Sequence, residues 1–340
     1  MSRTNGSGDV PTMDDVAVAA DVSRALVSLV FRDSPKVSNE RRQRVLDAAK
    51  QLGYRPNVLA RDLARRRSGT VGVLLNDLHN PFFAGVYDGV EMAAGEMGLR
   101  LVLTVSRQRD AGEYAAIETM LGQRVDGMIL ASPRLDADLI LDAAAVTPIV
   151  VVGRNVVGPN CDSVMTDEVA GADLVVRHLH ALGHRELTHV DGGRGAGAIA
   201  RRQGVVEAAA AVGIGPVDII PGDFTESAGV AAARELLARP SLPTAVFAAN
   251  DLVAIGLMAT LEEAGVQVPN DISVVGFDNT ALAGLRHVAL TTVDQSCPEM
   301  GYQAMDLLRG RSDGVRDEPL VTLTAPRLVT RRSTSAPRRT

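Results

Sequence analysis

Hydrophobic and polar positions divide the chain into a short helical part and a long part in which strands and helices alternate. From residue 12 to residue 52, apolar residues recur at the helical period in three bursts, MDDVAVAA, SRALVSLVF and NERRQRVLDAAKQL. Each burst follows a residue whose side-chain oxygen can cap a helix: Thr12, Ser23 or Ser38. The pattern predicts three helices, and the tight gap before Ser23 is typical of a helix-turn-helix.

From residue 70 onward the apolar residues form short runs without alternation, which is typical of parallel strands covered on both faces. The predicted strands are VGVLL, LVLTV, GMIL, PIVVV, LTHV, VDII, AVFAAN and ISVVGF. Helical segments such as FFAGVYDGVEMAAGEMG lie between them and supply crossovers, so the fold class is a doubly wound α/β body. Residues 70–330 are enough for two lobes, and a ligand is expected in a cleft between them, where the strands end.

Composition and the chain ends indicate a soluble cytoplasmic protein. The chain is 46% apolar, yet no apolar run reaches a membrane span of about 18 residues, and the start MSRTNGSGDVP lacks the pattern of a signal peptide. Cys161 and Cys297 form no CxxC pair, so a disulfide framework or a structural zinc site is not expected. Residues 1–11 and 331–340 are polar, and we expect a disordered lead and a disordered tail.

Charge is distributed unevenly along the chain. The net charge is −6, but the first 70 residues hold 13 Lys and Arg against 8 Asp and Glu, or +5, which leaves 22 minus 33, or −11, for the rest. The basic part ends in YRPNVLARDLARRRSGTVGVLL, where five arginines surround Leu59 and Leu63 on one helical face. A small basic head on an acidic body indicates a protein that presents one end to a polyanion.

The second predicted helix has a separate inner and outer face. Leu26, Val27 and Val30 have the spacing to face a three-helix core. The outward positions, together with the caps, are the candidate DNA contacts: Thr12, Ser23, Arg24, Ala25, Ser28 and Leu29. Arg24 can bind guanine through two hydrogen bonds, and the hydroxyls can bind phosphates. The alternative is an ordinary three-helix bundle with solvated charges.

The order of these residues resembles the DNA-binding head of the LacI/GalR family of bacterial transcription regulators. The resemblance covers TMDDVAVAADVSRALVSLVF, a second VS pair and LGYRPN, in register over about fifty residues. It implies a helix-turn-helix domain over 12–56, followed by a hinge helix and linker over 57–69. It further implies that Asn57 starts the hinge, that Leu63 wedges between base pairs, and that Arg61 lies beside phosphates.

Two positions depart from the family pattern. Asp21 stands where the family usually has Gly in the turn, and Leu29 stands where it often has Arg. The guanidinium contact at the second position is therefore lost, and we expect Arg24 to replace it. No other member's operator sequence can be transferred to this chain.

The resemblance continues through the body, on NPFF, LGH, AANDL, GFDN and LTTVDQ. It places the family's effector positions on Phe82, Phe83, Arg154, Arg201, Phe224, Asn250 and Asp278. Aromatic rings, a carboxylate, an amide and a guanidinium suit a polyol, so the expected effector is a sugar or sugar derivative. For single residues the alternatives are that Asn250 caps a helix, Phe83 belongs to the core and Arg201 is a solvated helix residue.

Three other interpretations of the sequence have less support. GRGAGA satisfies the glycine spacing of a dinucleotide turn, but it follows a strand well inside the body and not the first one. His178, His180 and His184 lack an HExxH pattern or a further ligand, so no metal and no cofactor is expected. A secreted sugar-binding protein would share the body but not the basic head.

The sequence therefore predicts a non-enzymatic, homodimeric transcriptional regulator, most simply a repressor. Two heads would occupy a pseudo-palindromic operator in double-stranded DNA, and a carbohydrate effector bound in the 70–330 body would change operator affinity. The polar end of the chain lacks the apolar heptads of a tetramer seam, which favours a dimer.

Overall fold

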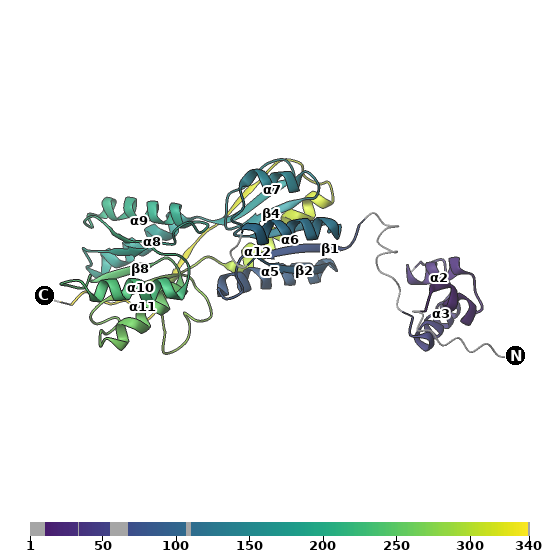
Figure 1. Ribbon diagram of the computed structural model, residues 1–340, viewed down its shortest axis with the longest axis horizontal. Helices are drawn as coiled ribbons and strands as arrows, with labels where there is room; N and C mark the ends of the chain where they lie inside the picture. The colour runs from purple at the N-terminus through teal and green to yellow at the C-terminus, as the bar shows by residue number, and fades with distance from the viewer. Residues whose placement is uncertain (1–10, 33, 55–66, 107–109, 339–340) are drawn as a thin grey trace. The chain divides into compact units, whose positions relative to one another are not determined.

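The protein consists of two compact units, Met1–Ser68 and Gly69–Thr340. The computed structural model describes residues 11–32, 34–54, 67–106 and 110–338, drawn in colour in Figure 1. The predicted lead (1–11) and hinge helix (57–69) lie almost wholly outside the described residues. Across the described ranges, no helix is long and apolar enough to cross a membrane.

The first unit is the predicted three-helix head. Its helices are α1 (Met13–Ala19), α2 (Arg24–Phe31) and α3 (Asn39–Leu52). Thr12 forms a capping box with Asp15, and the Ser23 hydroxyl accepts from the backbone of Leu26, so both caps are confirmed. Ser38 occupies the cap position of α3 without a side-chain hydrogen bond. Apolar side chains from all three helices form the core, including the fully buried Val16, Val27 and Val45.

The second unit contains two six-stranded sheets. In spatial order the first is β11 (Val321–Thr324), β5 (Cys161–Thr166), β4 (Ile149–Val152), β3 (Gly127–Ala131), β1 (Thr70–Leu75), β2 (Arg100–Val105). The second is β12 (Arg327–Val329), β10 (Thr291–Asp294), β9 (Ser273–Asp278), β8 (Ala245–Ala248), β6 (Thr188–Val190), β7 (Asp218–Ile220). All neighbouring strands are parallel except β10 and β12. The carboxyl ends of nearly all strands in each sheet therefore meet at one edge.

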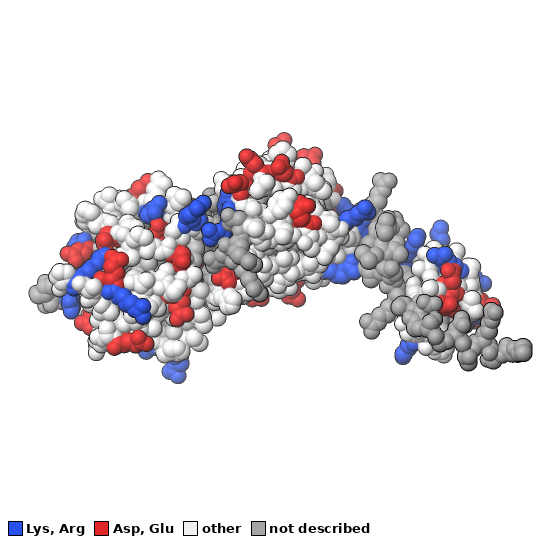
Figure 2. Space-filling view, in the orientation of Figure 1, with Lys and Arg blue, Asp and Glu red and all other residues white. Residues whose placement is uncertain are grey.

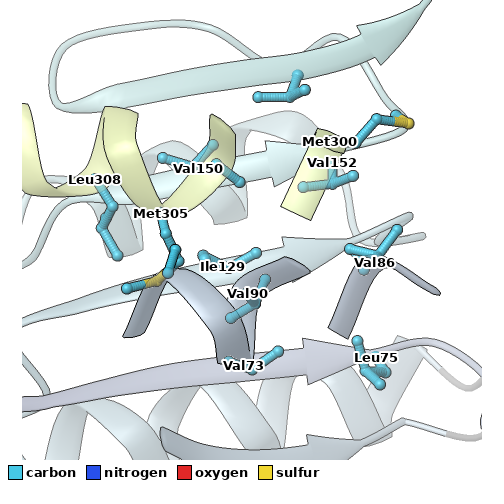
Figure 3. Packing of buried hydrophobic residues seen from close by; sticks show 14 of the residues in the cluster. Val73, Leu75, Val86, Val90, Ile129, Val150, Val152, Met300, Met305 and Leu308 are labelled. Atoms are coloured by element: carbon cyan, nitrogen blue, oxygen red, sulfur yellow. The ribbon is translucent and has the colours of Figure 1, made fainter. Parts of the chain in front are cut away.

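Helices cover both faces of each sheet, as predicted for a doubly wound body (Figure 1). The first sheet packs against α5 (Pro81–Met97) and α12 (Cys297–Ser312) on one face and α6 (Asp110–Gly122) and α7 (Ala137–Ala144) on the other. The second packs against α8 (Glu168–Leu182) and α9 (Ala198–Val212), and against α10 (Glu226–Leu237) and α11 (Asp251–Glu263). Figure 3 shows α5 and α12 inserting Val90 and Met305 over Val73 and Ile129.

The chain crosses between the two lobes three times, after β5, after β10 and after β11. One residue from each crossing meets the others, namely Thr166, Gln295 and Thr324. The hydroxyl of Thr324 lies 3.2 Å from that of Thr166 and donates to the carbonyl of Gln295 at 3.4 Å. The three connections are therefore joined to one another by contacts between hydroxyl and carbonyl groups.

The eight predicted strands are present, whereas β5, β10, β11 and β12 had not been predicted. Strand β5, CDSVMT, carries the fully buried Asp162. Although burial alone raises the pKa of Asp162, hydrogen bonds from Arg311 and Arg316 hold it below its ordinary value. A buried carboxylate bound by arginines from distant positions looks polar in sequence, so the hydrophobic pattern fails there.

Residues 331–338 are ordered, so the prediction of a disordered tail is wrong for them. The Ser333 side chain accepts from the backbone N–H of Thr291 at 2.8 Å and donates to the carbonyl of Val274 at 2.6 Å. The backbone N–H of Arg331 donates to the Thr291 hydroxyl at 2.9 Å. These polar residues complete the hydrogen bonding of β9 and β10, which composition alone could not indicate.

We predict that deleting residues 331–340 destabilises the second unit by at least about 2 kcal/mol, because the buried N–H of Thr291 loses its acceptor. Urea unfolding followed by circular dichroism measures the change. Deleting only residues 339–340 is the matched control and should leave the unfolding midpoint unchanged. Equal midpoints for the two truncations would show that the packed tail contributes no stability.

Candidate functional site

The outer face of α2 is the candidate DNA-reading surface of the head. Arg24, Ala25 and Leu29 are exposed, whereas Val27 and Val30 are buried, as the spacing predicted. The Arg24 guanidinium lies 3.6 Å from the Asp14 carboxylate, and both side chains are about two-thirds exposed at 68% and 66%. Such an exposed pair contributes little energy, so Arg24 can turn toward a base at low cost.

Polar groups near α2 hold the helix in place as well as facing outward. The hydroxyls of Thr12 and Ser23 are engaged in helix caps, and Ser28 is half-buried. Sequence reasoning missed Arg42 of α3, which donates to the carbonyls of Val30 at 3.4 Å and Ser34 at 2.7 Å. This arginine fixes the carboxyl end of the reading helix. The remaining candidates, Asn57, Arg61 and Leu63, lie outside the described residues.

In the body, Arg201 is buried at the start of α9 rather than solvated. It is 3% exposed and donates through Nε and Nη2 to one carboxylate oxygen of Glu168, at 2.9 and 2.7 Å. It also donates to the carbonyl of Ala249, and its guanidinium lies 3.5 Å from the ring centre of Phe277. Burial raises the pKa of Glu168, and the charge of Arg201 opposes that rise.

Asn250 and Phe224 are joined by a hydrogen bond and lie near Arg201. Asn250 is 1% exposed, and its side-chain oxygen caps α11 by accepting from Val253 at 3.0 Å. The cap function weighed from the sequence is therefore present. Its amide nitrogen donates to the carbonyl of Phe224 at 3.2 Å, which positions the half-buried aromatic ring. The ring centre lies 5.6 Å from the guanidinium of Arg201.

Asp278 ends β9 in a strained conformation. Its φ of 115° and that of Asn279, 52°, lie in the left-handed region that side chains disfavour. The carboxylate accepts from the Gln295 amide at 2.5 Å. Burial raises the pKa of Asp278 well above its ordinary value, and the carboxylate of Asp251 raises it further. Backbone strain combined with a buried carboxyl is characteristic of functional sites.

The candidates from the first lobe have packing and bracing roles. Phe82 and Phe83 are 8% and 6% exposed, belong to the core under α5, and pack edge to face with ring centres 5.2 Å apart. The core role weighed for Phe83 is therefore present. Arg154 donates to the carbonyls of Pro133 at 3.1 Å and Leu135, so it braces the loop after β3.

The structure brings Arg201, Phe224, Asn250 and Asp278 together, and adds residues that the sequence did not single out. Glu168 and Gln295 bind Arg201 and Asp278. Asp191 directly follows β6 and accepts from Arg202 of α9, and His189 lies within β6. Glu168 and Gln295 follow β5 and β10, two strands that the apolar pattern missed. Recognising these strands would have placed both residues at the crossings.

Two of the three histidines considered for a metal, His178 and His184, contact the tail. His178 lies 3.0 Å from the Thr334 hydroxyl, and His184 donates to the carbonyl of Ser335 at 2.9 Å. The glycines of GRGAGA have a packing role. A Cβ at Gly195, or at Gly192 directly before the motif, would lie 2.2 or 2.5 Å from ring atoms of Phe224, so the ring packs closely against glycine at both positions.

Comparison with known proteins links this arrangement to a family. Residues 12–57 match "Bacterial regulatory proteins, lacI family", and residues 176–334 match "Periplasmic binding protein-like domain". The repressor CytR of Escherichia coli is 34% identical, with 89% of this chain and 90% of that protein covered. The regulator CelR of Thermobifida fusca is 36% identical, with 95% and 98% covered.

Two solved structures resemble this chain both in sequence and in fold. The lac repressor dimer bound to operator and the anti-inducer ONPF is 29% identical at a TM-score of 0.85, covering 96% of this chain and 100% of that one. The CelR–cellobiose complex is 33% identical at a TM-score of 0.70, covering 95% and 99%. The predicted resemblance and fold class are confirmed, and the chain belongs to the lacI family of bacterial regulatory proteins.

Proposed function

We propose that the chain is a homodimeric, cytoplasmic repressor whose affinity for a pseudo-palindromic operator is set by a small neutral effector, a sugar or sugar derivative. The observation that carries this proposal is the pairing of an outward-facing reading helix in the first unit with a buried cluster of polar groups at the strand ends of the second. CytR is named a repressor, and the lac repressor structure is a dimer bound to operator.

The head supplies two kinds of DNA contact in this proposal. Arg24 reads a guanine in the major groove, with Ala25, Ser28 and Leu29 beside it, and Thr12 and Ser23 approach phosphates at the helix ends. In the hinge segment, Asn57, Arg61 and Leu63 are assigned to the minor groove, where an inserted leucine kinks the duplex. Figure 2 shows basic side chains on the visible face of the head, consistent with its net positive charge.

The effector is assigned to the carboxyl ends of the strands, between the lobes of the second unit. Asp278 and Arg201 form hydrogen bonds with adjacent hydroxyls of the sugar. The ring of Phe224 covers the C–H face of the sugar, and Asn250 positions Phe224 through its backbone carbonyl. Phe82, Phe83 and Arg154 bound the site from the first lobe. The relatives include the CelR–cellobiose complex and a lacI-family regulator from Enterococcus faecium with bound ribose.

The three crossings connect the proposed effector site to the first lobe, whose strand β1 directly follows the head and hinge segment in the chain. Glu168 and Gln295 hold Arg201 and Asp278, and both lie at connections between the lobes. A ligand that engages Arg201 and Asp278 changes the hydrogen bonds at these connections. It alters operator occupancy only by the difference between its affinities for the DNA-competent and DNA-incompetent states.

We predict that Arg24→Ala costs about 1–3 kcal/mol of discrimination at one base position of each half-site, because the bidentate contact is lost. The operator is first selected from random duplexes with the wild-type chain. Fluorescence anisotropy then measures binding of the selected operator and of its single-base variants.

Arg44→Ala is the matched control, since it removes the same charge from the exposed face of α3. It should weaken the operator and a scrambled duplex by the same factor. If Arg24→Ala also weakens both duplexes equally, Arg24 contacts phosphates and not a base.

We predict that Asp278→Asn weakens effector binding at least about tenfold while operator binding in the absence of effector is retained. The amide oxygen still accepts from Gln295, so the strand end keeps its shape, but the second carboxyl oxygen is replaced by an NH2 group that cannot accept from a hydroxyl. Calorimetry with ribose, cellobiose and further neutral sugars measures the loss, and anisotropy with the operator measures the response.

Asp306→Asn provides the control, because that carboxylate forms an exposed pair with Arg309 on α12. Its sugar affinity should match the wild type. If no sugar changes the affinity for the operator, the carbohydrate effector is wrong. The DNA-binding part of the proposed function would still stand.

A further inference from the structure

Two buried acceptor atoms beside the end of β6 have no hydrogen-bond partner among the described residues: Nε2 of His189 and Oδ1 of Asp191. His189 has no exposed surface, and Asp191 is only 4% exposed. Buried polar atoms in folded proteins are paired in the great majority of cases, because an unpaired one is costly. Two unpaired acceptors only two residues apart therefore indicate a site at which a bound molecule can supply hydrogen-bond donors.

The ring of His189 is held in one tautomer. Its Nδ1 lies 2.9 Å from the carbonyl oxygen of Phe247, which can only accept, so Nδ1 carries the proton and Nε2 presents a lone pair. The ring also packs against that of Phe247, with centres 5.1 Å apart. Burial lowers the pKa of His189 to about 4, so the ring stays neutral at pH 7. At neutral pH, Nε2 is an acceptor.

Only one of the two carboxylate oxygens of Asp191 has a hydrogen-bond donor among the described residues. Its Oδ2 accepts from Nη1 of Arg202 at 2.8 Å, whereas Oδ1 has no donor within the described part of the chain. The Arg202 side chain is 41% exposed, so its ion pair faces water on one side. Partly exposed pairs contribute little stability, and Arg202 can turn outward to uncover the carboxylate.

The pair adjoins the site already described. Asp191 directly precedes the glycine-rich loop of residues 192–197, on which the ring of Phe224 packs. Arg202 follows Arg201 in α9, the helix that this loop leads into. The ring of Phe247, on which His189 packs, has its centre 6.3 Å from that of Phe277, the ring beneath the Arg201 guanidinium. The two acceptors therefore lie beside the buried Arg201 end of the proposed effector site.

We propose that His189 and Asp191 form an acceptor subsite that takes a hydroxyl or amino group of the effector and excludes a phosphate or carboxylate there. The proposal rests on the proposed function and specifies its ligand. A vicinal diol or an amino group offers two adjacent hydrogens, one for each atom. A phosphate or carboxylate offers only acceptor oxygens. These would be repelled by the lone pair of His189 Nε2 and by the negative charge of Asp191.

The first test needs no effector. The full chain is labelled with ¹⁵N-histidine, and the His189 signals are assigned by their loss in His189→Phe. At pH 7 we expect a protonated Nδ1 and an unprotonated Nε2, with no change down to pH 5. A protonated Nε2 at pH 7 would overturn the proposal, because that atom would then be a donor.

The second test uses ribose, 2-deoxyribose, cellobiose, glucosamine and ribose 5-phosphate as calorimetric probes. Any probe that binds the wild-type chain through a diol or amine should bind His189→Phe and Asp191→Asn at least about tenfold more weakly. His178→Phe is the matched control, since it makes the same change at the tail anchor. Both subsite variants must still bind operator, which verifies that they fold.

The pattern across probes separates the possibilities. If ribose binds the wild type more tightly than 2-deoxyribose does, and this difference disappears in His189→Phe, the subsite binds a hydroxyl group. If His189→Phe weakens the binding of glucosamine, the subsite binds an amino group. Unchanged affinity in both subsite variants, or preferred binding of ribose 5-phosphate that depends on His189, overturns the proposal. If no probe binds, the carbohydrate effector fails, and the histidine spectrum alone decides whether the acceptor subsite stands.

Discussion

The buried ion pair between Arg201 and Glu168 is the interaction on which the proposed effector site of the second unit depends. Removing a guanidinium from water is costly unless its hydrogens are paired, and here each of its three nitrogens donates to a protein acceptor. The pair fixes the start of α9 to the first crossing between the lobes. Phe277 beneath the guanidinium and Phe224 near it complete the enclosure. Loss of either charge would leave the other buried and alone.

The same edge stores conformational strain. Asp278, Asn279 and Ser296 adopt positive φ angles where β9 and β10 end, and the side chains of Gln295 and Arg331 hold this region in place. Ser296 follows Gln295 at the second crossing, so strain and lobe connection coincide. A ligand that binds at these strand ends acts on a region with few alternative conformations. This arrangement suits a switch between two discrete states better than a gradual deformation.

Charge separates the two tasks of the chain. The head carries the positive excess and an exposed Arg24, which suits contact with a polyanion. The body carries the negative excess, and two of its arginines form ion pairs with carboxylates, Arg201 with Glu168 and Arg202 with Asp191. The head can thus be attracted to DNA without exposing the body's guanidiniums to it, and the body can select ligands by hydrogen bonding.

The sequence alone identified the three helices and their caps at Thr12 and Ser23, because local periodicity and capping act over a few residues. It also identified eight apolar strands and four residues that the second lobe brings together. It did not reveal β5, whose Asp162 is neutralised by arginines about 150 positions away, nor the packed tail, whose polar residues pair with distant backbone groups.

Only the tertiary structure decided how the candidate residues act. It showed Asn250 as a cap that positions Phe224, Arg154 as a brace and Phe83 as core, and it added Glu168, Gln295, His189 and Asp191. The physical reason is that burial and hydrogen-bond partnership depend on segments distant in sequence. The chemistry of a side chain can be read from its type, but its role depends on which groups already satisfy it.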